Sequence, residues 1–235
     1  MKDQHLIDLC RAYLFSTGSS EGGSVKRAKK DGPLVTLSRA AGARGTAIAE
    51  EIVRQLEAHP FIPRHRPWTL FNQNLIQHVI REHGLPQRTA DYFPEDKSDR
   101  IREIIGEIVG LHSGTYTTMC KTAETIRQLA QTGNTVIVGR GGNFLTADIV
   151  HSINARLVGS LEHRARYHAR IRGIGLGTAE EEILNLDRAR KRYIKRIFNE
   201  NIDNPLLYDL VINTDRFSDA HVAAIVIAAL EKKME

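Results

Sequence analysis

The residues best suited to chemistry in this 235-residue chain follow an apolar segment at positions 34–38. That segment, LVTLS, has the composition of a strand, and residues 45–59 have the apolar spacing of a helix. The turn between them is rich in glycine and alanine and carries Arg39 and Arg44. Helix N-termini attract anions, and arginine binds phosphate through paired hydrogen bonds, so this turn predicts a phosphate-binding loop. The alternative is an ordinary tight turn with solvent-facing arginines.

The turn departs from the phosphate-binding signature G-x-x-x-x-G-K-[ST], in which lysine contacts the terminal phosphates and Ser or Thr contacts Mg²⁺. At the four defined positions this chain has Arg39, Arg44, Gly45 and Thr46, so only the Thr46 hydroxyl matches. Two explanations stay open. Either Arg39 or Arg44 supplies the charge from a new backbone position, or the loop binds a nucleotide without efficient phosphoryl transfer. Arginine is a planar fork and lysine a compact point charge, so the replacement is not conservative.

Further arginines occur in two later segments. Arg140 ends the apolar segment VIVGR, and a basic helical pattern follows a glycine-spaced bend at 173–177. The arginines spaced four apart on one face of that pattern are Arg188, Arg192 and Arg196. Because phosphoryl transfer requires the phosphate charge to be neutralised, positive charge is expected to converge from several segments, and the bend between two basic arms predicts a lid that closes over substrate. A basic surface helix is the alternative, since Lys191 and Lys195 also make the helix positive all round.

Short apolar segments alternate with helical patterns from position 34 onward. This alternation predicts a parallel sheet with helices on both faces, a three-layer α/β/α fold. The predicted strands cover residues 34–38, 153–161 and 207–215, with a further strand from 134 that ends in a Gly-rich turn. The predicted helices cover residues 45–59, 70–84, 101–111, 117–133, 163–201 in two arms, and 218–234. Residues 1–33 predict a short helix on a flexible basic linker, and residues 34–235 the α/β domain.

Composition limits the class of protein. The chain is 41% hydrophobic, enough for a sizeable core, and its net charge of +5 with a pI near 9.3 favours anionic partners. Cys10 and Cys120 form no C-x-x-C pair, which predicts reduced thiols in a cytoplasmic protein. No apolar run reaches the roughly 20 residues that cross a bilayer, so we expect no membrane insertion.

Several motifs occur in the order found in one known family. They are V-T-L-S-R-x-x-G-x-x-G from residue 35, F-N-Q-N-L-I at 71–76, V-I-V-G-R-G-G-N-F at 136–144, D-R-A-R-K-R-Y at 187–193 and L-Y-D-L-V-I-N-T-D at 207–215. This pattern resembles the cytidylate-kinase-like family, whose members typically read I-S-R-x-x-G-S-G-G-R and then Y-D-K-E-L-I. The resemblance implies a P-loop kinase core, a monophosphate-binding region and an arginine-bearing lid.

The resemblance also implies roles for individual residues. ATP is expected to bind the loop, with Thr46 on Mg²⁺, and the loop residues are Ser38, Arg39, Gly42, Ala43, Arg44, Gly45 and Thr46. The acceptor is expected at Arg140 and Gly141, with Asp187 and Arg190 as further substrate contacts, and the transferred phosphoryl group at Arg188 and Arg192. The family's turn typically reads G-R-D where this chain has Gly141, which removes an aspartate from the acceptor site. Asp187 has an alternative role as an intrahelical partner of Lys191.

The leading functional hypothesis is ATP-dependent phosphorylation of a small acceptor, most simply a nucleoside monophosphate such as CMP or dCMP. The alternative is a nucleotide-binding regulatory or pseudo-kinase module with little or no turnover. A third hypothesis, a nucleic-acid-binding protein that uses the basic arm, lacks interleaved aromatic residues and a base-reading motif.

Overall fold

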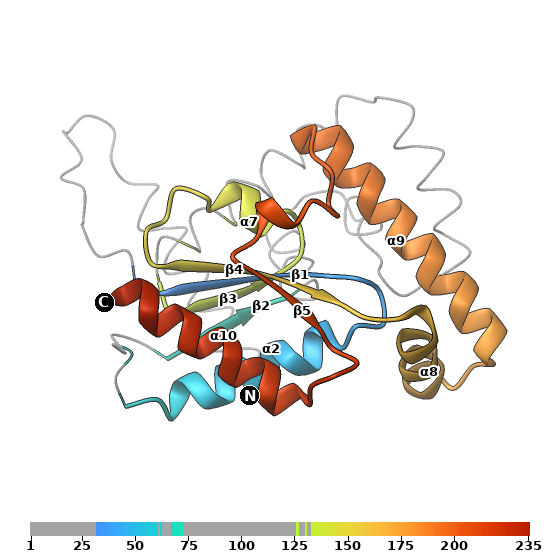
Figure 1. Cartoon of the computed structure of the whole chain (residues 1–235), viewed down its shortest axis with the longest axis horizontal. Helices are drawn as coiled ribbons and strands as arrows, with labels where there is room; N and C mark the ends of the chain where they lie inside the picture. The colour runs from blue at the N-terminus through green and yellow to red at the C-terminus, as the bar shows by residue number, and fades with distance from the viewer. Residues whose placement is uncertain (1–31, 61, 63–66, 73–125, 127–129, 131–132) are drawn as a thin grey trace, which may run out of the picture.

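The computed structural model describes residues 32–60, 62, 67–72, 126, 130 and 133–235. A five-stranded parallel sheet forms its centre, in the order β2-β3-β1-β4-β5 (Figure 1). The strands are β1 (Leu34–Arg39), β2 (Thr69–Phe71), β3 (Thr135–Val138), β4 (Ser152–Val158) and β5 (Leu210–Asn213). The helices are α2 (Gly45–Glu57), α7 (Gly142–Leu145), α8 (Leu161–Arg172), α9 (Leu176–Phe198) and α10 (Asp219–Met234), with a 3₁₀ turn at Pro205–Leu207. The parallel α/β fold predicted from the sequence is confirmed.

One face of the sheet forms the main hydrophobic core against α2 and α10. Alternate strand residues such as Val35 and Leu37 point into this core, together with the buried stripe of α2, which includes Ile48 and Ile52. Figure 1 shows α2 and α10 side by side beneath the strands. The side chain of Ser218 accepts a hydrogen bond from the backbone N–H of His221, which caps the start of α10.

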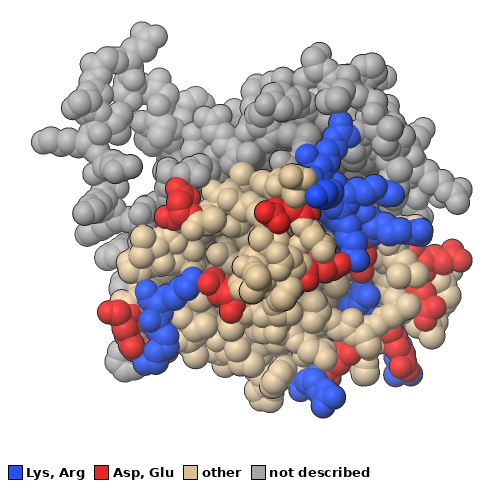
Figure 2. Space-filling model, turned by 45° about the horizontal axis from the view of Figure 1, so that its top comes forward, with Lys and Arg blue, Asp and Glu red and all other residues tan. Residues whose placement is uncertain are grey.

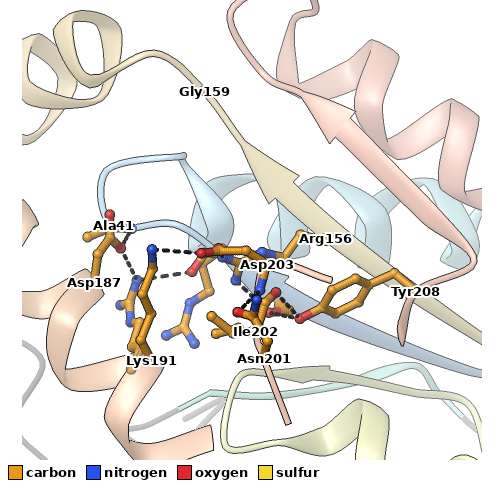
Figure 3. Close-up of polar contacts among 12 residues, drawn as sticks. Ala41, Arg156, Gly159, Asp187, Lys191, Asn201, Ile202, Asp203 and Tyr208 are labelled. Carbon is orange, nitrogen blue, oxygen red and sulfur yellow. Dashed lines mark hydrogen bonds and ion pairs between the residues drawn. The ribbon is translucent and has the colours of Figure 1, made fainter. Parts of the chain in front are cut away.

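The opposite face of the sheet is polar along its two central strands. The Thr36 hydroxyl donates to Asn154 Oδ1 at 2.6 Å, and Arg156 Nη1 donates to Ser38 Oγ at 2.9 Å. Arg156 is only 6% exposed, and its guanidinium also contacts Asp203 and lies 5.9 Å from the ring centroid of Tyr208 (Figure 3). A buried charge requires such partners, so this face is built to support polar groups near the end of β1.

Helices α8 and α9 form a hairpin beyond the carboxyl ends of the strands (Figure 1). Ser160 caps α8 by accepting from the N–H of His163, and Gly173 ends it in the left-handed conformation at φ 66°. Ile183 and Leu186 of α9 pack on Ala165 of α8 in a small second core. The bend predicted at 173–177 therefore separates two helical arms, as expected.

The helix predicted for residues 70–84 is wrong at its start. Leu70 and Phe71 belong to β2, which pairs in parallel with β3, and the N–H of Thr69 donates to the carbonyl of Asn134. The edge of the sheet thus overrides the helical spacing at these residues. The N-terminal extension over 1–31, Cys10, Cys120, residues 73–84, the helix at 101–111 and most of that at 117–133 lie outside the described residues.

Candidate functional site

The loop between β1 and α2 has a defined backbone shape that explains its small residues. Gly42 and Arg44 adopt left-handed conformations, at φ 76° and 58°. A Cβ added to Gly42 would lie 2.5 Å from the carbonyl oxygen of Arg164, so α8 packs directly on the loop. Ala41 and Ala43 are buried, while Thr46 is exposed in the first turn of α2. The loop is compact, and larger side chains would not fit beneath α8.

Polar contacts connect this loop to α8 and α9. The N–H of Ala41 donates to Asp187 Oδ1 at 2.7 Å (Figure 3). Arg164 Nη1 donates to both the carbonyl of Ala41 and Asp187 Oδ2, at 2.8 and 2.7 Å. Arg190 Nη1 donates to the carbonyl of Arg39 at 3.2 Å. Two of the expected substrate contacts, Asp187 and Arg190, therefore lie against the expected phosphate loop.

The alternative role of Asp187 as an intrahelical partner of Lys191 is not seen, and its neighbour within α9 is Arg190, whose Nη1 lies 3.9 Å from Asp187 Oδ1. Lys191 forms its ion pair with Asp203 instead, at 2.6 Å between Nζ and Oδ2 (Figure 3). The side chains of Asp187 and Arg164 are 20% and 11% exposed, so their pair is largely shielded from water. Such a pair is costly to break, because it would leave one buried charge without its partner.

Arg44 holds a different part of the chain. Its Nη2 donates to the carbonyls of Thr214 and Phe217 at 2.5 and 2.6 Å, and its Nη1 lies 3.1 Å from Asp219 Oδ1. These partners belong to the connection between β5 and α10 and to the first residue of α10. The guanidinium of Arg44 thus anchors that connection to the loop.

A first hollow, here called the inner hollow, lies between the loop and the turn after β3. Arginines from three segments line it: Arg39 at the end of β1, Arg140 in the turn and Arg190 on α9. Burial raises the pKa of the Tyr193 hydroxyl at its edge, against a smaller opposing effect from the charge of Arg140. Three guanidinium groups around one hollow are suited to binding a phosphate or another compact anion.

The turn after β3 has a left-handed backbone throughout. Gly139, Arg140 and Gly141 have φ values of 80°, 56° and 70°. A Cβ on Gly141 would lie 2.3 Å from the ring of Phe198, which stacks on Phe144 with 4.5 Å between ring centroids. An aspartate at position 141 would therefore collide with Phe198. Gly141, which stands where the G-R-D pattern has aspartate, thus leaves the space that the ring of Phe198 occupies.

A second hollow, here called the outer hollow, lies on the other side of the loop and has a volume of about 380 Å³. Its lining comes from the loop, α8 and the β5–α10 connection: Gly42, Arg44, His163, Arg164, Arg166, Tyr167, Arg170, Thr214, Asp215 and Phe217. The sequence patterns did not predict this hollow. The signal for its α8 wall was a set of basic and aromatic residues at helical spacing, but the facing wall lies about fifty residues further along the chain.

Asp215 is the acidic residue of the outer hollow. Burial of its carboxyl raises the pKa, but hydrogen bonds from the backbone and side chain of Ser160 and the charges of His163 and Arg164 lower it. The net pKa of Asp215 lies below its ordinary value, so the carboxylate is ionised at neutral pH. The hollow is nevertheless dominated by arginines, with Arg170 lying 5.5 Å from the ring centroid of Tyr167.

The expected lid arginines are placed differently from Arg190. Arg188 and Arg192 are exposed, and Arg188 Nη2 donates to Asn185 Oδ1 at 2.6 Å. The face of α9 that turns inward carries Ile183, Asp187, Arg190 and Ile194. Figure 2 shows Lys and Arg side chains gathered in the region of α9. In this structure α9 contacts the loop through Arg190, and not through Arg188 or Arg192.

The residues present fit Mg²⁺ only as a companion of a bound nucleotide. The Thr46 hydroxyl is exposed beside the loop and can contribute one oxygen ligand. Within the described ranges, no group of three or more His, Cys, Asp or Glu residues is arranged to hold a metal ion. Phosphate oxygens and water would have to complete the coordination.

Among the described helices, none has both the length and the apolar character of a bilayer-spanning helix.

The sheet order, the loop after the central strand and the helical hairpin at the strand ends define an α/β fold of the P-loop kinase class. An uncharacterised protein from Eubacterium ventriosum shares it with a TM-score of 0.62 at 15% identity, over 85% of this chain and 98% of that one. Shikimate kinase from Acinetobacter baumannii, solved with shikimate, matches with a TM-score of 0.50 at 14% identity, over 89% of this chain and 99% of that one. These similarities concern the fold alone.

The chain belongs to the cytidylate kinase-like family, which matches residues 34–216. Cytidylate kinase from Methanopyrus kandleri is 27% identical over 117 residues, which covers 46% of this chain and 61% of that protein. The chain therefore spans less than two thirds of the length of that relative.

Proposed function

We propose that the protein transfers a phosphoryl group from ATP to a small acceptor that carries a phosphate, most simply CMP or dCMP. The observation that carries this proposal is the presence of two arginine-lined hollows on the two sides of one loop. Arg39 of the loop lines the inner hollow, and Gly42 and Arg44 line the outer hollow. A transferase that joins two phosphorylated molecules needs two anion sites whose contents meet at one place.

The outer hollow is suited to the donor. Its volume of about 380 Å³ accommodates a nucleoside, and Tyr167 and Phe217 offer aromatic surface for a base. The triphosphate of ATP would run toward the loop, past Arg44 and the first turn of α2, where Thr46 would share Mg²⁺ with the phosphate oxygens. The magnesium ion would supply charge neutralisation at the donor phosphates.

The inner hollow is suited to the phosphate group of the acceptor, because its volume of about 40 Å³ has room for that group but not for a whole nucleotide. Arg140 and Arg190 would hold the acceptor phosphate, and Arg39 lies on the side nearest the loop. Phosphoryl transfer involves little covalent chemistry by the protein, so positioning and neutralisation of developing charge would account for the rate. In this arrangement Gly141 lines the hollow without a side chain that could read the base, and Arg190 is the expected substrate contact of α9 that lines it, whereas Asp187 contacts the loop amide of Ala41.

A nucleotide-binding module without turnover is the second candidate. It would follow if the hydrogen bond from the N–H of Ala41 to Asp187 persists in the bound state and keeps this loop amide from the transferred phosphoryl group. This candidate predicts nucleotide binding with no ADP formed.

The test measures ADP release from Mg²⁺-ATP with CMP, dCMP, UMP, AMP and GMP, beside the shift in unfolding temperature that each nucleotide causes. Turnover with one acceptor supports the kinase and names its substrate. Arg140→Ala should then lose roughly a hundredfold in rate. Arg54→Ala, which removes an exposed arginine of α2 paired with Glu51, is the matched control and should keep full activity. Stabilisation by ATP without ADP in any mixture would favour the binding module.

A further inference from the structure

The side chain of Arg39 runs past two glycines, Gly45 and Gly139, and occupies the space next to each. It starts at the end of β1 and crosses the first residue of α2. A Cβ added to Gly45 would lie 2.8 Å from Cγ of Arg39 and 3.3 Å from its Cβ and Cδ. The aliphatic part of Arg39 therefore fills the space in which a side chain at position 45 would begin.

Gly45 is not required by the backbone. The glycines with positive φ among the described residues are Gly42, Gly133, Gly139, Gly141 and Gly173, and Gly45 is not one of them. Any residue could adopt its conformation at the start of a helix. The contact with Arg39 is thus the feature that excludes a side chain at position 45.

The other end of Arg39 reaches the turn after β3. A Cβ added to Gly139 would lie 1.9 Å from Nη1 of Arg39 and 3.0 Å from its Cζ. The guanidinium therefore lies directly on the backbone of this turn, beside Arg140 and Arg190 in the lining of the inner hollow. Arg39 spans from the donor loop to the acceptor side.

Position 45 is the place of the lysine in G-x-x-x-x-G-K-[ST], and position 39 is that of its first glycine. We propose that the two positions have exchanged roles. Arg39 supplies the positive charge that the lysine of the signature would supply, and Gly45 leaves the space that the side chain of Arg39 occupies. This inference rests on the proposed function. It assigns the role to Arg39 and not to Arg44, whose guanidinium is held by Thr214, Phe217 and Asp219.

The exchange has a chemical consequence. A lysine at the helix N-terminus is a point charge on the donor phosphates, whereas the planar fork of Arg39 can donate to two oxygens at once. From its place between the loop and the inner hollow, one edge can face the terminal phosphate of ATP and the other the acceptor phosphate. Arg39 would then align the two substrates as well as neutralise their charge.

The test is a double-mutant cycle of the full chain with Arg39→Gly, Gly45→Lys and both together. Binding of ATP, adenosine and inorganic tripolyphosphate is measured by calorimetry, and ADP release is measured in parallel. Arg39→Gly should weaken the binding of ATP and tripolyphosphate by at least about tenfold and that of adenosine by less than about threefold, because the lost hydrogen bonds are to phosphate oxygens. Arg54→Ala, again the matched loss of one arginine, should leave the affinities for ATP and tripolyphosphate unchanged.

Gly45→Lys alone should also weaken the binding of ATP and tripolyphosphate, since Arg39 occupies the space that the lysine side chain would need. The double variant should bind ATP more tightly than either single variant, because the lysine can then enter. A double variant weaker than both singles, or an Arg39→Gly variant with unchanged ATP and tripolyphosphate affinity, overturns the exchange. If Gly45→Lys does not fold, Arg39→Lys and Arg39→Gly decide: the lysine variant should recover part of the lost affinity, and equal affinities overturn the proposal.

Failure of the proposed function gives a different pattern. If the native chain binds tripolyphosphate but forms no ADP with any acceptor, and Arg39→Gly loses that binding, the exchange stands and the kinase activity does not. If the native chain binds neither ATP nor tripolyphosphate, both proposals are wrong.

Discussion

The turns after β1 and β3 lie at the carboxyl ends of neighbouring parallel strands, yet they are held in place by different means. Each is rich in glycine and each has an arginine in the left-handed conformation, Arg44 at φ 58° and Arg140 at φ 56°. The first turn is fixed by polar contacts from α8, α9 and the β5–α10 connection. The second is bonded to β1 through the N–H of Gly139, which donates to the carbonyl of Leu37, and the closest neighbour of Gly141 is the ring of Phe198, which stacks on Phe144.

This difference separates two tasks. Hydrogen bonds and ion pairs can be exchanged for those of a ligand at a small net cost, because one set of partners replaces another. Close packing against a ring cannot be exchanged in this way. The first turn is therefore suited to change its partners when an anion arrives, and the second is suited to stay fixed. Variants that remove each kind of support test this comparison.

The largest effect is expected in the first turn, from Asp187→Ala. Removal of the carboxylate leaves Arg164 largely buried without its ion-pair partner, so the free energy of unfolding should fall by about 3 kcal/mol. Chemical denaturation measures this change. The matched control is Glu162→Ala, which breaks the ion pair between Glu162 and Arg166. The side chains of these two residues are 63% and 62% exposed, so the loss should cost about 0.5 kcal/mol or less. Equal losses would show that the contacts of α9 do not support the first turn.

A smaller difference from the matched control is expected in the second turn, from Gly141→Ala. The new methyl group would collide with the ring of Phe198, which should cost about 2 kcal/mol beyond the strain of the left-handed backbone. Gly173→Ala is the control, because Gly173 has a similar φ of 66° and nothing lies within 4 Å of an added Cβ. The two variants are compared by thermal unfolding. Similar unfolding temperatures for both would mean that Phe198 does not restrict the turn.

The smallest effect is expected at the left-handed arginine that each of the two turns contains. Replacing either left-handed arginine by glycine should leave the protein about 1 kcal/mol more stable than replacing it by alanine, because glycine adopts positive φ without steric cost. The comparison is between Arg44→Gly and Arg44→Ala, and between Arg140→Gly and Arg140→Ala, by denaturant unfolding. An advantage of glycine at one position only would show that the two turns do not share this backbone shape.

Much of the fold could be predicted from the sequence because its core elements carry local signals. The apolar segment at 34–38 and the stripe of α2 both follow the expected periods, and the parallel sheet is confirmed. Thr69–Phe71 could not be recognised as a strand, because a short edge strand depends on its neighbour more than on its own residues.

The candidate site was only partly predictable for a different reason. Arginines occur on several sides of α9, so their spacing alone does not say which face turns inward. The buried positions Ile183, Leu186 and Ile194 set that face, and they select Arg190 over Arg188 and Arg192. The outer hollow joins α8 to the β5–α10 connection, a contact between distant segments that no local pattern encodes. The roles of all these residues in binding and catalysis stay predictions.

The carboxylate of Asp187 on the amide of Ala41 also affects how any measured affinity should be interpreted. A phosphate that takes this amide must displace the carboxylate, so the protein contains its own competitor for the position. The apparent dissociation constant then reports an exchange of one anion for another. It equals the intrinsic constant divided by the fraction of molecules in which the amide is free, so the apparent affinity is weaker than the intrinsic one.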